Sequence, residues 1–227
     1  MLVRNVEGQF KVPAGYESKA SVKSMRNVNI DILRGVGMLL VIFGHSGCKW
    51  PLYPAIYAFH MPLFFIVSGF FYSSKRSIGS TVIKELNRLI IPYIAISLIT
   101  YVILLMTNGY HDLFLKCFLI GNSFDNEANF VIGPIWFLLA MFWCKIIYRS
   151  LNLLLNIKGL TIILTILTIL IVLTQSSFYN NLYKYPFCIL QGIVCLLYYH
   201  YGHLLRENYP PPSPSENSRF QRDFDLI

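Results

Sequence analysis

The sequence predicts an all-α integral membrane protein, a polytopic bundle of about six transmembrane helices. Of its 227 residues, 55% are hydrophobic and only 13% are charged, a composition that soluble domains seldom have. The mean hydropathy is +0.53. The apolar residues gather in runs about as long as a bilayer crossing. The basic residues, which give a net charge of +8, lie in short clusters between these runs. This is the pattern of the positive-inside rule and not of a nucleic-acid-binding surface, so no nucleic-acid partner is expected.

The six expected helices are apolar runs separated by turn-forming or basic segments. They cover residues 29–46, 52–72, 89–106, 130–148, 151–174 and 182–205. The first two form a hairpin, and residues 73–88 are a hydrophilic link. The fifth run is firmly apolar only over 160–173, and the sixth is the weakest because polar residues dilute it. The apolar piece at 113–120 is too short to cross, so we expect it either to lie at the interface or to re-enter the protein.

The segments at the two ends differ in composition from the apolar core. Residues 1–27 are polar and lack the apolar stretch of a secretory signal, so the N-terminus is expected to stay in the cytoplasm. Residues 28–206 form the membrane domain, and residues 207–227, rich in Pro and Ser, are expected to be a disordered cytoplasmic tail. With this orientation, the basic residues expected to face outside are only Lys49, Lys116 and Lys184. The five cysteines show no metal spacing and indicate no disulfide framework.

The first helix carries an unusual pair of polar residues, Arg34 and His45. Eleven residues on a helix make three turns plus about 20° and a rise of about 16 Å, so both side chains share one face. The hairpin brings back a second histidine, His60, at a similar depth. Two imidazoles close together suit proton transfer, although a helix-end histidine bonded at the interface is an equally good interpretation of His45 alone. No third ligand is evident, so no metal site is expected.

Three bases, Arg34, Lys84 and Arg88, are expected to cluster at the cytoplasmic ends of the first and third helices. One interpretation is simple anchoring by snorkelling side chains. The other is a cradle for phosphate groups, for which forked arginine donors are well suited. His111, His200 and His203 have no identifiable partner in the sequence, and we expect them to be interfacial or solvated.

Four stretches, in this order and spacing, resemble the successive signatures of the type 3 acyltransferases, the bacterial integral-membrane O-acetyltransferases. They are DILRGVGMLLVIFGH (31–45), IYAFHMPLFFIVSGFFY (56–72), KELNRLIIPY (84–93) and GPIWFLLAMFW (133–143). The resemblance covers about residues 27–206. It implies about ten transmembrane helices in the bacterial cytoplasmic membrane, cytoplasmic acetyl-CoA as acyl donor, and a hydroxyl of a surface, exported or lipid-linked glycan as acceptor.

The resemblance also implies roles for particular residues. His45 corresponds to the catalytic histidine of the family, and Arg34 to the arginine that precedes it with ten residues in between. Lys84 and Arg88 correspond to the basic pair that is implicated in holding coenzyme A, although Glu85 stands where the family commonly has an arginine. His60 is the second catalytic candidate, expected to orient or protonate a partner.

The chain leaves the family pattern after about six helices, so a truncated acyltransferase is expected. The competing interpretation is an inactive or partner-dependent membrane protein, either a remnant of an acyltransferase or a transporter-like bundle.

Overall fold

The computed structural model describes residues 28–46, 53–75, 77–107, 114, 118, 135–174 and 186–209. The predicted N-terminal segment 1–27, most of the predicted tail 207–227 and His111 lie outside the described residues. The chain divides into two compact units, residues 34–210 and the two ends, 1–33 with 211–227. The described part of the second unit is the beginning of one helix, so the fold below is that of residues 34–210.

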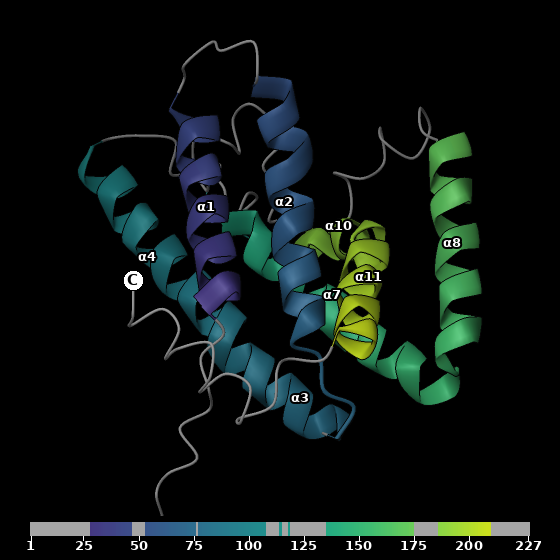
Figure 1. Ribbon diagram of the computed structural model, residues 1–227. Helices are drawn as coiled ribbons and strands as arrows, with labels where there is room; N and C mark the ends of the chain where they lie inside the picture. The colour runs from purple at the N-terminus through teal and green to yellow at the C-terminus, as the bar shows by residue number, and fades with distance from the viewer. Residues whose placement is uncertain are drawn as a thin grey trace, which may run out of the picture. The chain divides into compact units, whose positions relative to one another are not determined.

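Every element of secondary structure in the described residues is a helix, as predicted. The elements are α1 (Val28–His45), α2 (Tyr53–Phe70), α3 (Ile78–Glu85), η1 (Leu86–Ile90), α4 (Ile91–Met106), α7 (Trp136–Leu154), α8 (Ile157–Leu173), η3 (Pro186–Cys188), α10 (Ile189–Val194) and α11 (Leu196–Asn208). Within residues 34–210 they make six helical segments. Successive segments run in alternating directions, so that α2 and α11 are parallel to each other (Figure 1).

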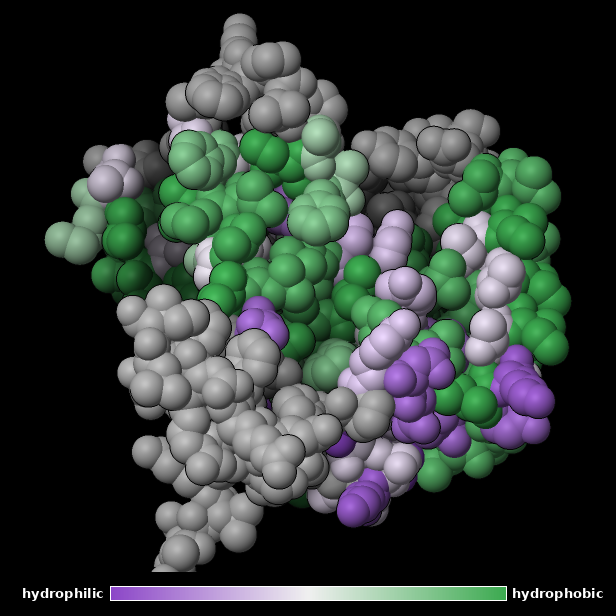
Figure 2. Space-filling view, in the orientation of Figure 1, coloured by the Kyte–Doolittle hydropathy of each residue, from purple (hydrophilic) through white to green (hydrophobic). Residues whose placement is uncertain are grey.

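Two described helices are long and apolar enough to cross a membrane. They are the continuous helix Ile78–Met106, of 29 residues, and Trp136–Leu154, of 19 residues. Apolar side chains cover the outside of α8, where Ile162 is 60% and Val172 61% exposed (Figure 2). Aliphatic surface of this extent is what a helix presents to lipid, because lipid imposes no cost on exposed hydrocarbon. The prediction of six crossings stays a prediction.

The third helix begins earlier than predicted, because the hydrophilic link is itself largely helical. Ser77 caps α3 by accepting a hydrogen bond from the Ser80 amide. The helix then passes through η1, a π turn in which the Ile91 amide donates to the carbonyl of Leu86, five residues back. Pro92 follows directly, and proline lacks the N–H and crowds the carbonyl that an α-helix would use there. The wider turn accommodates it and keeps the helix continuous.

Two other predicted boundaries are wrong. α7 continues to Leu154, past the predicted end at residue 148, so Arg149 also lies within the helix. Asn156 then caps α8, because its side-chain oxygen accepts a hydrogen bond from the Gly159 amide. The predicted sixth run is broken into η3, α10 and α11, and Phe187 and Cys188 have φ values of 59° and 54°. Non-glycine residues seldom adopt this left-handed conformation, and sequence periodicity does not reveal it.

Glycines bring α2 and α11 into backbone contact. A Cβ at Gly69 would overlap the carbonyl oxygen of Tyr199, and a Cβ at Gly202 would overlap that of Ile66. Small residues allow membrane helices to approach this closely, and van der Waals contact along the backbone then holds them together. α1 lies against α2 through Gly37, where an added Cβ would be 3.1 Å from the Phe64 ring. The core between α2, α7, α8 and α11 includes Phe65, Tyr148, Leu160 and Leu196.

Two residues of the short apolar piece at 113–120 are described, and both pack on α4. The Phe114 ring lies 4.8 Å from that of Tyr101, and the Phe118 ring stacks on Tyr93 at 5.5 Å. The Tyr93 hydroxyl also donates a hydrogen bond of 2.8 Å to the Phe118 carbonyl. Phe114 is buried, so at these two positions the segment packs against the protein.

Candidate functional site

A polar pocket of about 150 Å³ is lined by residues of α1, α2, α3, the π turn, α7 and α11 and of the segment that follows α2. Its lining combines four basic side chains with one carboxylate and a set of hydroxyl and aromatic groups. These residues are Arg34, Ser68, Phe71, Tyr72, Ser73, Thr81, Lys84, Glu85, Arg88, Lys145 and Tyr199. The formal charge of the lining is +3, so the pocket attracts anions, and in a region of low dielectric that attraction is strong.

The three bases predicted to cluster, Arg34, Lys84 and Arg88, all line this pocket. α1 supplies Arg34, the last turn of α3 supplies Lys84 and the π turn supplies Arg88. The Arg34 guanidinium carbon lies 4.8 Å from the centre of the Phe71 ring, a cation–π contact that orients it. The geometry therefore places two forked donors and an ammonium around one cavity.

A fourth base, Lys145, comes from α7 and is held by Glu85. Their Nζ and Oε2 atoms are 2.8 Å apart, and the side chains are 15% and 7% exposed. Glu85 follows Lys84 directly in the sequence, yet Glu85 is buried whereas Lys84 is only partly buried. A buried carboxylate requires a partner, and the ammonium from the neighbouring helix provides it. Lys145 is not identifiable as a site residue from the sequence alone, because its partner Glu85 lies 60 residues earlier.

His45 and His60 lie apart from this pocket. His45 is the last residue of α1 and is exposed, whereas His60 is 1% exposed within α2. The two imidazoles are close enough for their charges to interact, as the predicted hairpin requires. Because α1 is an uninterrupted α-helix from Val28 to His45, Arg34 and His45 share one face and are separated by a rise of about 16 Å.

A short hydrogen bond sets the tautomer of His60. Its Nδ1 is 2.6 Å from the carbonyl oxygen of Ile56, one turn earlier in α2. A carbonyl oxygen can only accept, so Nδ1 carries the proton. In the neutral ring Nε2 then holds the lone pair, and His60 can accept a proton or a hydrogen bond at that atom.

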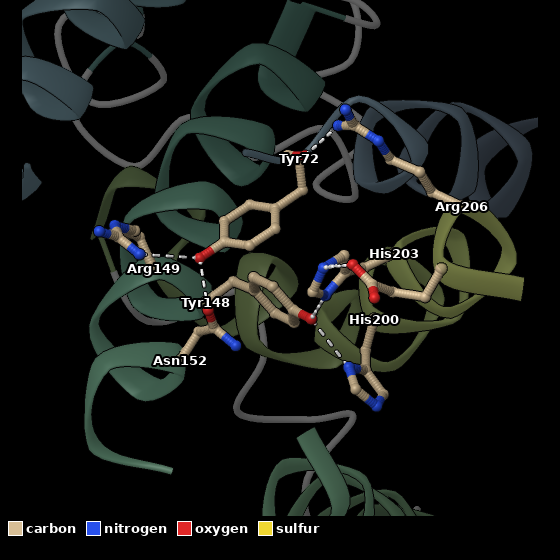
Figure 3. A network of polar contacts seen from close by, with 8 residues as sticks. Tyr72, Tyr148, Arg149, Asn152, His200, His203 and Arg206 are labelled. Atoms are coloured by element: carbon tan, nitrogen blue, oxygen red, sulfur yellow. Dashed lines mark hydrogen bonds and ion pairs between the residues drawn. The ribbon is translucent and has the colours of Figure 1, made fainter. Parts of the chain in front are cut away.

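Tyr72, which forms part of the pocket wall, is tied to two helices. Its hydroxyl donates to Asn152 Oδ1 at 2.7 Å and accepts from Arg149 Nη1 at 3.1 Å (Figure 3). Its carbonyl accepts a hydrogen bond from Arg206 of α11. The ring packs edge-on against Tyr148 at 5.0 Å and His203 at 4.6 Å. These contacts fix the end of α2, and with it one wall of the pocket.

Behind this wall, Tyr148 bridges two histidines of α11. Its hydroxyl oxygen is 2.8 Å from Nδ1 of both His200 and His203 (Figure 3). The prediction that these two histidines are interfacial or solvated is wrong, because they are 1% and 8% exposed. Their spacing of three residues places both on one face of α11, and the partner that buries them comes from α7. A sequence pattern does not indicate which helices meet.

The hydrogen bonds of this cluster have a defined direction. The Thr161 hydroxyl donates its only proton to the Ile157 carbonyl, so His200 must donate from Nε2 to Thr161 Oγ1 at 2.8 Å. A neutral His200 then accepts at Nδ1 from the Tyr148 hydroxyl. The Tyr148 oxygen in turn accepts from Nδ1–H of His203, whose Nε2 faces Glu207 Oε1 at 3.5 Å. The cluster joins α7, α8 and α11 with every hydroxyl proton assigned.

Comparison with known proteins gives a family and one similar protein. A family model described as an acyltransferase domain matches residues 27–220. The chain is 28% identical over 160 residues to the nodulation protein NolL of Mesorhizobium japonicum. That match covers 64% of this chain and 39% of NolL, so it spans about two fifths of the relative's length. No solved structure matches.

Proposed function

Because the chain belongs to the acyltransferase family that matches residues 27–220, an integral-membrane family whose members transfer acyl groups, we propose that it is an O-acyltransferase using cytoplasmic acetyl-CoA. The acceptor in this proposal is a hydroxyl of a cell-surface, exported or lipid-linked glycan. The protein would lie in the bacterial cytoplasmic membrane with its N-terminus in the cytoplasm. The observation that carries the proposal is the arrangement along α1, with an anion-attracting pocket around Arg34 and a histidine pair about 16 Å away.

The pocket suits the phosphate groups of the donor and not the whole donor. Its volume is about 150 Å³, whereas sites that enclose a drug-sized ligand have about 300–1,000 Å³. Coenzyme A carries a diphosphate and a 3′-phosphate, and Arg34, Lys84 and Arg88 offer charge-assisted hydrogen bonds to such groups. The pantetheine arm would then extend along α1, where the distance to His45 matches its extended length of roughly 16 Å.

His45 is the proposed general base. It would take the proton from the acceptor hydroxyl as the oxygen attacks the thioester carbon. The new C–O bond forms, the C–S bond breaks, and the proton passes from the imidazolium to the departing thiolate sulfur. In an alternative, His45 carries the acetyl group briefly itself. Its exposure in α1 is consistent with access by both donor and acceptor.

His60 is proposed to orient the reacting groups. The Ile56 carbonyl accepts the hydrogen bond from Nδ1–H, so Nε2, which carries the lone pair, is the atom proposed to face the reacting groups. A buried ring held in one tautomer is a better positioning group than a mobile one, because its orientation and its tautomer are set before the reaction begins.

The test compares acetyl transfer in membranes that contain the full chain and its variants. With radiolabelled acetyl-CoA, we expect His45→Ala to lower incorporation at least 100-fold, the size typical of a lost general base. Ser46→Ala is the matched control, because the exposed Ser46 hydroxyl donates to the Phe43 carbonyl one turn back and contacts no other hydrogen-bond partner among the described residues. Release of the label by mild alkali would identify an ester. Transfer that survives His45→Ala at equal expression would refute the assignment, and wild-type membranes that transfer no label would favour the inactive or partner-dependent alternative.

A further inference from the structure

Lys145 is a mostly buried base of the pocket whose ammonium group has hydrogen-bonding capacity beyond its ion pair with Glu85. Among the described residues, Glu85 Oε2 is the only hydrogen-bond partner of its ammonium group. An ammonium has three N–H groups, so two are left for a ligand. The side chain is only 15% exposed and lines the cavity, which makes a ligand in the pocket the natural acceptor for them.

The ion pair with Glu85 is not explained by stability alone. A buried ion pair contributes little net stability, because removing two charges from water offsets most of their attraction. Here the pair lies in the wall of a cavity that three other cations already line. Glu85 lowers the positive charge that the pocket would otherwise carry, and it holds a flexible lysine side chain in one place. What the pair supplies to the pocket is a positioned ammonium group.

We propose that Lys145, oriented by Glu85, is a fourth donor-binding residue, which contacts a phosphate group of the acyl-CoA from the α7 side of the pocket. The inference rests on the proposed function, because it takes the anion in the pocket to be the donor's phosphate. Arg34, Lys84 and Arg88 reach the pocket from α1, α3 and the π turn, so Lys145 adds the contribution of another helix. Glu85 is a positioning residue and does not touch the donor.

The experiment measures the dissociation constants of coenzyme A and of pantetheine, which has no phosphate, for the full chain in lipid nanodiscs. Lys145→Met should weaken coenzyme A binding at least tenfold, which is ~1.4 kcal/mol, and leave pantetheine binding unchanged. Lys145→Arg, which keeps the charge and the donors, should restore most of the affinity. Lys158→Met is the control, because Lys158 is an exposed lysine at the start of α8 that does not line the pocket.

The double variant Glu85→Gln/Lys145→Met separates two explanations of a loss. In Lys145→Met the unpaired Glu85 carboxylate would also repel a phosphate and strain the fold, and the second substitution removes both effects. We expect only part of the affinity to return. Full return would overturn the proposal, since Lys145 would then merely neutralise Glu85. An unchanged affinity in Lys145→Met would also overturn it while leaving the proposed function intact. If the wild-type chain binds no coenzyme A, both fail.

Discussion

Replacement of Tyr148 by phenylalanine tests the buried cluster that joins α7, α8 and α11. The variant keeps the ring, and so its packing against Tyr72 at 5.0 Å, but removes the hydroxyl that is 2.8 Å from both histidines. His200 and His203 are 1% and 8% exposed, so water cannot readily replace the lost partner. The perturbation is therefore the loss of two hydrogen bonds with almost no change in shape.

The size of the effect follows from two estimates. Hydrogen bonds between membrane helices contribute about 0.6 kcal/mol each on average, and a buried polar group left without a partner costs about 1–3 kcal/mol. Each lost bond leaves one buried ring nitrogen without a partner, on His200 and on His203. At about 1 kcal/mol for each nitrogen, the low end of the range for a stranded polar group, the loss is roughly 2 kcal/mol. For a chain of this size, 1 kcal/mol corresponds to about 2–4 °C, so we expect the melting temperature to fall by about 4–8 °C.

The assay is thermal unfolding of the purified chain in detergent, followed by a thiol-reactive dye. Buried thiols such as Cys144, which is 0% exposed, become reactive only on unfolding. Tyr198→Phe is the matched control, because Tyr198 is on α11, the helix of His200 and His203, and is 40% exposed. Melting of Tyr148→Phe within 1 °C of the wild type would show that the bridge contributes nothing measurable, and the assigned directions of its hydrogen bonds would then have no energetic support.

Two further predictions concern helix packing and orientation. Gly202→Ala should lower the melting temperature by more than Tyr148→Phe does, because the added methyl group overlaps the Ile66 carbonyl and forces α2 and α11 apart. Gly79→Ala, where a Cβ meets nothing within 4 Å, should leave it unchanged or raise it, and equal behaviour of the two variants would contradict the close contact. In a chain whose native cysteines are replaced by serine, the thiol of Lys158→Cys should react with a membrane-impermeant maleimide only after the cells are opened, whereas labelling of intact cells would reverse the proposed orientation.

The helical class of the fold and the approximate positions of the helices are predictable from the sequence. An apolar run long enough to cross lipid has no alternative to a helix, because its backbone must satisfy its own hydrogen bonds. The convergence of Arg34, Lys84 and Arg88 is predictable as well, since alternating helices return their ends to the same side. Both arguments need only the lengths of the apolar runs and the alternating direction of successive helices.

The contacts that depend on which helices are neighbours are not predictable in this way. Lys145 meets Glu85, and Tyr148 meets His200, across 60 and 52 residues of sequence. A single sequence contains the residue types but not the packing that pairs them. The π turn at Leu86–Ile90 is a third case, because Pro92 signals a disturbance of the helix without specifying whether the result is a kink, a break or a wider turn.

That π turn also determines which way the halves of the long helix face. Along an unbroken α-helix, Glu85 and Tyr93 would point about 80° apart, since eight residues advance 800°. The one extra residue of the π turn removes about 100° of rotation, which brings the two buried side chains to within about 20° of each other. Deleting a single residue there would leave a separation of seven residues between the two side chains, which advances 700° along a regular α-helix, so the two halves would still face the same way. A substitution that turned the π turn into regular α-helix at the present length would instead rotate the basic half by about 100° away from the buried face of α4.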